Sequence, residues 1–108
     1  MNVSIVIPLY NQVEYTQKCM ESLRRHGMGQ AEILLIDNGS TDSTGEYLAT
    51  CSDVRVIRNR ENLGCAGAWN QGVRETHSEW VIILNNDVLV SSGWLEGCLL
   101  YTSPSPRD

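Results

Sequence analysis

The sequence contains no phenylalanine, a single lysine (Lys18) and no basic cluster larger than Arg24-Arg25. Its 8 Lys and Arg residues are outnumbered by 13 Asp and Glu residues, which gives the 108-residue chain a formal net charge of −5 at pH 7. An acidic surface opposes the counterion release that drives binding to DNA and RNA. We therefore expect no nucleic-acid partner.

Long apolar segments are also missing. No run approaches the roughly 20 residues that a membrane-spanning helix requires. The short apolar run near Met1 has no basic region before it, so it does not match a secretory signal. These two absences favour a cytoplasmic location.

The four cysteines form no C-x-x-C pair, and neither His26 nor His77 is close to a cysteine in the sequence. This spacing argues against a zinc site and against a disulfide framework. It favours buried, reduced thiols, as expected in a cytosolic protein. The residues concerned are Cys19, Cys51, Cys65 and Cys98.

What the sequence does contain is a set of four short apolar runs rich in β-branched residues, at positions 3–7, 33–36, 54–57 and 80–84. Nearly continuous apolar strands are typical of parallel sheets that are covered on both faces. Their spacing leaves room for a helix between successive strands. The sequence therefore predicts an α/β fold, a doubly wound, mostly parallel sheet with helices on both faces.

Helix signals lie between these runs. Asn11 with Glu14, and Ser43 with Glu46, have the spacing of capping boxes. A third helix is predicted over about 66–76, where internal glycines indicate a close backbone approach. A fourth is predicted over about 94–100.

Polar and aromatic side chains follow each predicted strand. In an open α/β sheet, ligands bind beyond the carboxyl ends of the strands, so these residues are expected to meet in one crevice. The clusters are 8–11, 37–42, 58–64 and 85–87.

These side chains have the chemistry needed to bind a nucleoside diphosphate with a divalent cation. Tyr10 is suited to stacking on a base, and Asp37 to accepting a hydrogen bond from a base or a ribose. Arg58 or Arg60 is suited to pairing with phosphate. Asp87 can hold Mg²⁺ or Mn²⁺ together with the diphosphate, because such ions usually take one or two carboxylates plus substrate oxygens.

Each cluster also has a simpler interpretation. Residues 37–40 and 85–87 have the composition of ordinary turns, and Arg58 and Arg60 can form a solvated edge. The turn after the first strand contains no glycine, which excludes a dinucleotide fingerprint and a P-loop there. It is the coincidence of all four clusters at one sheet edge that favours a binding site.

Five blocks in this order and spacing resemble family 2 glycosyltransferases, and together they cover about residues 2 to 100. The Asn-Asn-Asp form of the last block is most similar to the rhamnosyltransferase-like branch. The blocks are SIVIPLYN (4–11), IDNGSTD (36–42), NRENLG (59–64), GAWNQG (67–72) and LNND (84–87).

The resemblance implies a GT-A fold and transfer of a sugar from a nucleoside-diphosphate donor to an acceptor hydroxyl, with inversion, in polysaccharide or cell-envelope glycan synthesis. It implies base contacts from Pro8, Tyr10 and Asp37. Asp87 matches the last acid of the family's D-x-D motif. The nucleotide-binding residues predicted from pattern and resemblance together are Pro8, Tyr10, Asn11, Asp37, Asn38, Asn62, Gly64, Asn70, Asn85 and Asn86.

Asp87 is the predicted ligand of a divalent metal, Mg²⁺ or Mn²⁺. Asn85 stands where the family has the first acid of the motif, which removes one negative charge and leaves metal dependence open. The amide can still accept a hydrogen bond from a ribose hydroxyl.

The resemblance also implies that the general base lies beyond the end of this chain, and no catalytic residue is predicted within it. We expect residues 1–100 to be the nucleotide-sugar-binding half of a GT-A domain, inactive in transfer by itself. Residues 101–108 are expected to be a non-native or disordered tail. The expected partners are the nucleotide-sugar donor and, for the full-length enzyme, a glycan or lipid-linked acceptor, with peripheral binding to the inner face of the plasma membrane left open.

Functions of other classes remain as alternatives. A noncatalytic nucleotide-binding module would share the same residues. A phospho-receiver domain would need paired acids after the first strand, an aspartate after the third and a late lysine, and none of these is present. A nucleotidyltransferase would need a glycine-rich loop containing arginine after the first strand.

Overall fold

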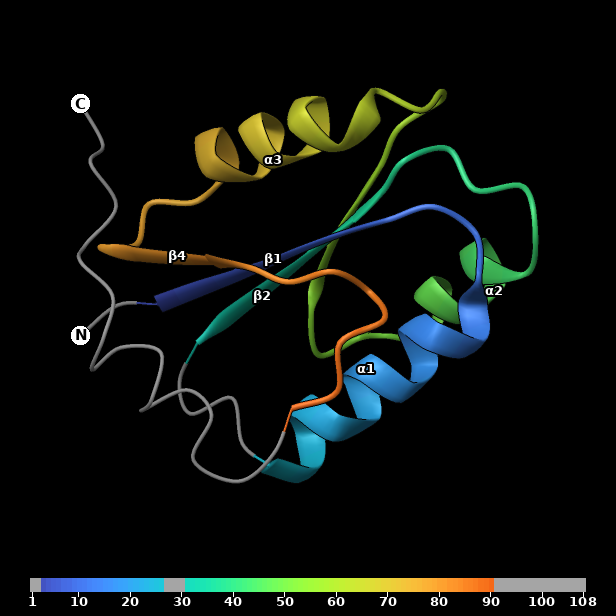
Figure 1. The fold of residues 1–108 in the computed structure, drawn as a ribbon, viewed down its shortest axis with the longest axis horizontal. Coiled ribbons are helices and arrows are strands. Elements are labelled where there is room, and N and C mark those ends of the chain that lie inside the picture. Colours follow the sequence, from blue (N-terminus) through green and yellow to red (C-terminus); the bar gives the residue numbers. More distant parts are fainter. Residues whose placement is uncertain (1–2, 27–30, 91–108) are drawn as a thin grey trace.

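The computed structural model describes residues 3–26 and 31–90. In it, helices pack on both faces of one β-sheet (Figure 1). The predicted helix at 94–100, the tail at 101–108 and Cys98 lie outside the described residues. In chain order the elements are β1 (Val3–Leu9), α1 (Val13–His26), β2 (Glu32–Asp37), α2 (Thr44–Ala49), β3 (Arg55–Arg58), α3 (Gly64–Glu75) and β4 (Trp80–Ile83).

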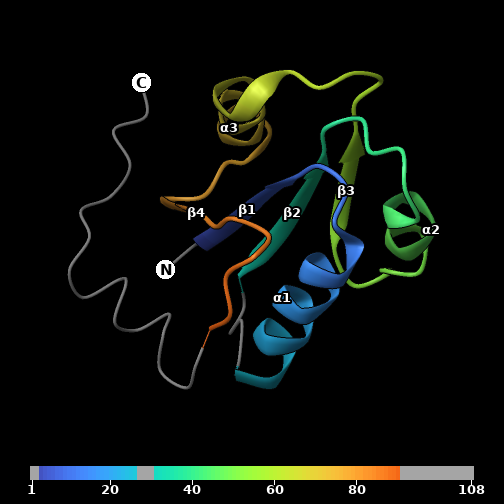
Figure 2. The same ribbon diagram turned by 45° about the vertical axis from the view of Figure 1, so that its right-hand side comes forward.

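The described strands form one four-stranded sheet in the order β3-β2-β1-β4, and every pair is parallel. Ile5 at the centre of β1 is paired with Ile33 of β2 and with Ile82 of β4. Helices α1 and α2 cover one face of the sheet and α3 covers the other (Figures 1 and 2). The predicted fold class is therefore confirmed.

Successive residues of β1 pack on opposite faces of the sheet, as strand geometry requires. Ile5 and Ile7 pack with Met20 and Leu23 of α1, whereas Val6 packs with Ala68 of α3. This two-sided burial explains why the strands read as continuous apolar runs.

Helix α3 lies close to the sheet because a glycine faces it. A Cβ atom added to Gly72 would lie 2.4 Å from Val6 Cγ1 and 3.1 Å from Ile36 Cδ1. The close backbone approach predicted from the internal glycines is present at this position.

Neither predicted capping box forms. Helix α1 begins at Val13, after Asn11 and Gln12 with φ angles of 55° and 58°. The Gln12 carbonyl accepts from the amides of Tyr15 and Thr16, whereas the Asn11 side chain bonds to another loop. Ser43 makes no side-chain cap bond to α2.

The three cysteines in the described part of the chain are free thiols. Cys19 and Cys51 are buried, as predicted, whereas Cys65 is exposed in the first turn of α3, contrary to the prediction. No helix in the described ranges is both long enough and apolar enough to cross a membrane.

Candidate functional site

A cleft of about 340 Å³ opens at the carboxyl ends of the strands. It lies where the sheet order reverses, because β2 and β3 follow on one side of β1 while β4 lies on the other. Such a switch point is where open α/β sheets bind ligands. The cleft is lined by Pro8, Leu9, Tyr10, Asn38, Asn62, Gly64, Cys65, Asn85, Asn86 and Asp87.

Most of the sequence-predicted site residues therefore meet in this cleft, and they come from four separate strand ends. Leu9, which lies within the predicted cluster at 8–11, and Cys65 also line the cleft but are not among the predicted nucleotide-binding residues. Cys65 could have been predicted as a lining residue, because it directly follows Gly64 at the start of α3. Asn11, Asp37 and Asn70 do not line the cleft.

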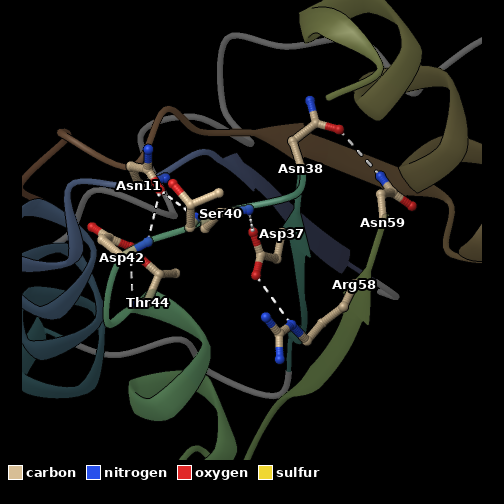
Figure 3. Close-up of polar contacts among 9 residues, drawn as sticks. Asn11, Asp37, Asn38, Ser40, Asp42, Thr44, Arg58 and Asn59 are labelled. Carbon is tan, nitrogen blue, oxygen red and sulfur yellow. Dashed lines mark hydrogen bonds and ion pairs between the residues drawn. The ribbon is translucent and has the colours of Figure 1, made fainter. Parts of the chain in front are cut away.

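Asp37 is buried in the turn after β2 and bonds to protein groups there, and its predicted contact with a base remains a prediction. Its side chain is 1% exposed; Oδ1 accepts from the Ser40 amide at 2.8 Å, and Oδ2 accepts from Arg58 Nε at 3.2 Å (Figure 3). Arg58, predicted as a phosphate partner, is held by this carboxylate. Its guanidinium lies against Gly45 of α2, where an added Cβ would be 2.6 Å from Nη2.

Asn11 joins the turn after β1 to the turn after β2, beside Tyr10. Its side-chain Oδ1 accepts from the backbone amides of Thr41 (2.7 Å) and Asp42 (3.2 Å), and its backbone amide donates to Ser40 Oγ at 2.7 Å (Figure 3). The left-handed conformation at Asn11 is one that asparagine tolerates. The contacts indicate that Asn11 holds the loop that carries Tyr10.

Asp42 connects the same two turns from the other side. Hydrogen bonds from Thr44, together with the amides of Val13 and Gln12 at the start of α1, hold the pKa of its carboxyl below the usual range. A carboxylate at this end of a helix also complements the helix dipole.

Asn38 is 5% exposed and faces the opposite side of the strand end from Asp37. Its Nδ2 donates to the Gly64 carbonyl at 3.2 Å, and its Oδ1 accepts from the Leu63 amide at 3.0 Å. Asn38 thus connects β2 to the residues that begin α3.

The loop after β4 supplies the acidic end of the cleft. Asn86 Nδ2 donates to Oγ1 of buried Thr16 in α1 at 3.1 Å, which ties this loop to the helix. Burial, and secondarily the charge of Asp87, raise the pKa of the Cys19 thiol to about 11. The Cys19 thiol therefore stays protonated near neutral pH, behind an exposed carboxylate.

The described residues contain no group of three or more His, Cys, Asp or Glu side chains that could hold a metal ion. Asp87 is the one carboxylate among the cleft-lining residues. With the amide oxygens beside it, this donor set fits a cation that takes most of its ligands from a diphosphate and water. It does not fit a metal held by protein side chains alone.

Comparison with known proteins confirms the family that the sequence blocks resemble. The family model for glycosyl transferase family 2 matches residues 4–106. Glycosyltransferase GlyG of Streptococcus pneumoniae is 31% identical over 98% of this chain and 36% of its own length. Glycosyltransferase AglE of Haloferax volcanii is 29% identical over 87% of this chain and 33% of its own length.

Solved structures share the fold. Residues 1–349 of S. aureus TarS, in complex with UDP-GlcNAc, superpose with a TM-score of 0.82 at 21% identity, over 93% of this chain and 30% of that one. The mannosyltransferase PcManGT of Pyrobaculum calidifontis, in complex with GDP-Man and Mn²⁺, gives a TM-score of 0.74 at 22% identity, over 81% and 28%. The chain thus spans about a third of the length of each of these four proteins. It belongs to glycosyltransferase family 2 and has the GT-A fold.

Proposed function

We propose that this chain binds the nucleoside-diphosphate-sugar donor of a glycosyltransferase that acts with inversion in polysaccharide or cell-envelope glycan synthesis. The observation that carries the proposal is the cleft at the switch point of the sheet, lined by Tyr10, by Asn62 and Gly64, and by Asn85 to Asp87. The complexes of TarS with UDP-GlcNAc and of PcManGT with GDP-Man support it, because both proteins have this fold.

The chemistry of each lining residue suits it to a different part of the donor. Tyr10 is 45% exposed at the cleft, so its ring is free to stack on a base. The amides of Asn62 and Asn85 can donate to, or accept from, ribose and base groups. Fixed loops position these groups before the ligand arrives, which lowers the entropic cost of binding.

Asp87 is the residue that would hold a divalent cation, shared with the diphosphate. When bound, the cation supplies charge stabilisation for the leaving diphosphate. Asn85 contributes no charge to the site, so cation affinity depends on Asp87 and on the donor's own phosphate oxygens. We therefore expect weak cation binding without nucleotide and stronger binding with it.

Calorimetric titration with UDP and GDP, with and without Mn²⁺, tests the proposal. We expect Mn²⁺ to strengthen nucleotide binding, and Asp87→Asn to remove this gain, because the substitution deletes the carboxylate charge. Asp53→Asn is the matched control, since Asp53 pairs with Arg24 and does not line the cleft. A protein that binds neither nucleotide contradicts the proposed function. If Mn²⁺ still strengthens nucleotide binding in Asp87→Asn, Asp87 is not the ligand of the cation.

A further inference from the structure

The residues that form one wall of the cleft, here called the α3 wall (residues 62–65), gain little from apolar burial. Leu63 is 47% exposed, and Asn62, Gly64 and Cys65 are exposed as well. Gly64 has a φ of 78° and leads directly into α3. Hydrogen bonds, and not packing, must therefore hold this wall.

Within the wall, the Gly64 amide donates to Asn62 Oδ1 at 2.7 Å, and the hydrogen bonds that tie the wall to β2 come from Asn38. Its side chain contacts the wall twice, at Leu63 N and at Gly64 O, which uses both the acceptor and a donor of the amide. Gly39 adds a close contact, because a Cβ there would lie 3.0 Å from the carbonyl carbon of Glu61. The end of β2 therefore supports the wall from behind.

Asn38 is itself held by a second amide. Asn59, directly after β3, donates from Nδ2 to Asn38 Oδ1 at 3.2 Å (Figure 3). The same Nδ2 donates to Gln71 Oε1 at 2.9 Å, and Gln71 Nε2 donates back to Asn59 Oδ1 at 2.9 Å. Gln71 is on α3, next to Gly72, whose backbone packs on Val6.

We propose that Asn38, Asn59 and Gln71 form an amide relay that positions the α3 wall for nucleotide binding, with Asn38 and Gln71 acting as positioning residues. The relay closes a loop of contacts from the wall, through the ends of β2 and β3, back to the body of α3. This inference rests on the proposed function. It assigns a role in binding to Gln71, which does not line the cleft.

The competing interpretation is that Asn38 contacts the nucleotide directly and that the Asn59–Gln71 pair only stabilises the fold. The two interpretations differ in what happens at Gln71. If the relay positions the wall, Gln71→Leu disturbs the wall from a distance. If Asn38 is a direct ligand, Gln71→Leu leaves binding unchanged.

Cys65 provides a probe of the wall that does not depend on any ligand. It is exposed in the wall, whereas Cys19 and Cys51 are buried. With Cys98 replaced by serine, the rate at which a neutral maleimide labels Cys65 reports how firmly the wall is held. The experiment compares Gln71→Leu and Asn38→Ala with Gln17→Leu, a matched change at an exposed position on α1.

We expect Gln71→Leu to weaken UDP binding by about fivefold to tenfold, the size expected for one or two lost hydrogen bonds, and to speed Cys65 labelling. Gln17→Leu should change neither, and thermal unfolding confirms that all variants are folded. Because both substitutions break one relay, the double variant Asn38→Ala/Gln71→Leu should bind UDP no more weakly than Asn38→Ala.

Unchanged binding and labelling in Gln71→Leu overturns the relay. Loss of binding in Asn38→Ala alone, with Cys65 labelling unchanged, assigns Asn38 as a direct ligand and also overturns it. If the parent protein binds no nucleotide, the proposed function fails, and the labelling rates by themselves still decide whether the relay holds the wall.

Discussion

At the scale of single residues, Asp37 and Asn38 show how two neighbours at one strand end serve different loops. Successive side chains of a strand point to opposite faces. Asp37 therefore bonds to Ser40 and Arg58 on one side (Figure 3), while Asn38 bonds to the α3 wall on the other. Exchanging the two residues would keep the composition and break both sets of contacts.

Asn11 gives the first prediction at this scale. Asn11→Ala removes the acceptor for the amides of Thr41 and Asp42. It also places alanine at a φ of 55°, in the left-handed region that alanine adopts less readily than asparagine. We expect it to lower the free energy of unfolding by about 1–3 kcal/mol. Urea denaturation followed by circular dichroism measures this loss.

Two further variants at the same position separate the causes. Asn11→Gly tolerates the left-handed conformation but lacks the acceptor, so its loss should be smaller than that of Asn11→Ala. Asn11→Asp keeps an acceptor oxygen and should stay close to the parent protein. If Asn11→Ala is as stable as the parent, the Asn11 contacts do not hold the two turns together.

At the scale of elements, α3 both forms a wall of the cleft and covers one face of the sheet. Its distance from β1 is set at Gly72. Gly72→Ala would normally gain up to about 1 kcal/mol of helix propensity. Here the new methyl group meets Val6 Cγ1, so we expect a net destabilisation of about 1–3 kcal/mol, measured by thermal or urea unfolding.

A double-mutant cycle with Val6→Ala tests the cause of that loss. Val6→Ala removes the Cγ1 and Cγ2 atoms that the new methyl group would meet, so the double variant should be less destabilised than the two single losses summed. Simple additivity would mean that Gly72→Ala acts through something other than this contact.

At the scale of the whole molecule, donor binding and sugar transfer place different demands on the chain. Inverting transfer needs a general base for the acceptor hydroxyl. Asp87, the one carboxylate among the described residues that line the cleft, is the proposed ligand of the cation. The chain also spans 36% of the length of its relative GlyG. Both facts agree with the proposal that the described residues bind the donor nucleotide.

The corresponding prediction is that the purified 108-residue chain binds UDP or GDP but transfers no sugar. An assay with radiolabelled nucleotide sugars and glycan or lipid-linked acceptors measures transfer, and calorimetry on the same sample verifies that the nucleotide site is intact. Transfer by this chain, abolished by Asp87→Asn, would show that a base is present after all.

The fold class, the order of the elements and the clustering of polar residues at one sheet edge could be predicted from the amino-acid sequence. Burial on both faces leaves a pattern of apolar runs that is visible without a structure. Because parallel strands all end at the same edge, each of the predicted clusters at 8–11, 37–42, 58–64 and 85–87 places at least one residue in the cleft. The glycine at position 72 also indicated the close approach of α3 before the structure showed it.

Which polar residues face the cleft, and which hold the loops around it, became known from the three-dimensional structure. Asn11, Asp37 and Arg58 have the residue types of ligands, yet they bond to protein groups. Whether a side chain meets a ligand or a neighbouring loop depends on strand register and on partners up to 31 residues away in the chain. Local sequence patterns carry no record of those distant partners. The relay from Asn38 to Gln71 exists only because the ends of β2 and β3 and the body of α3 meet in space.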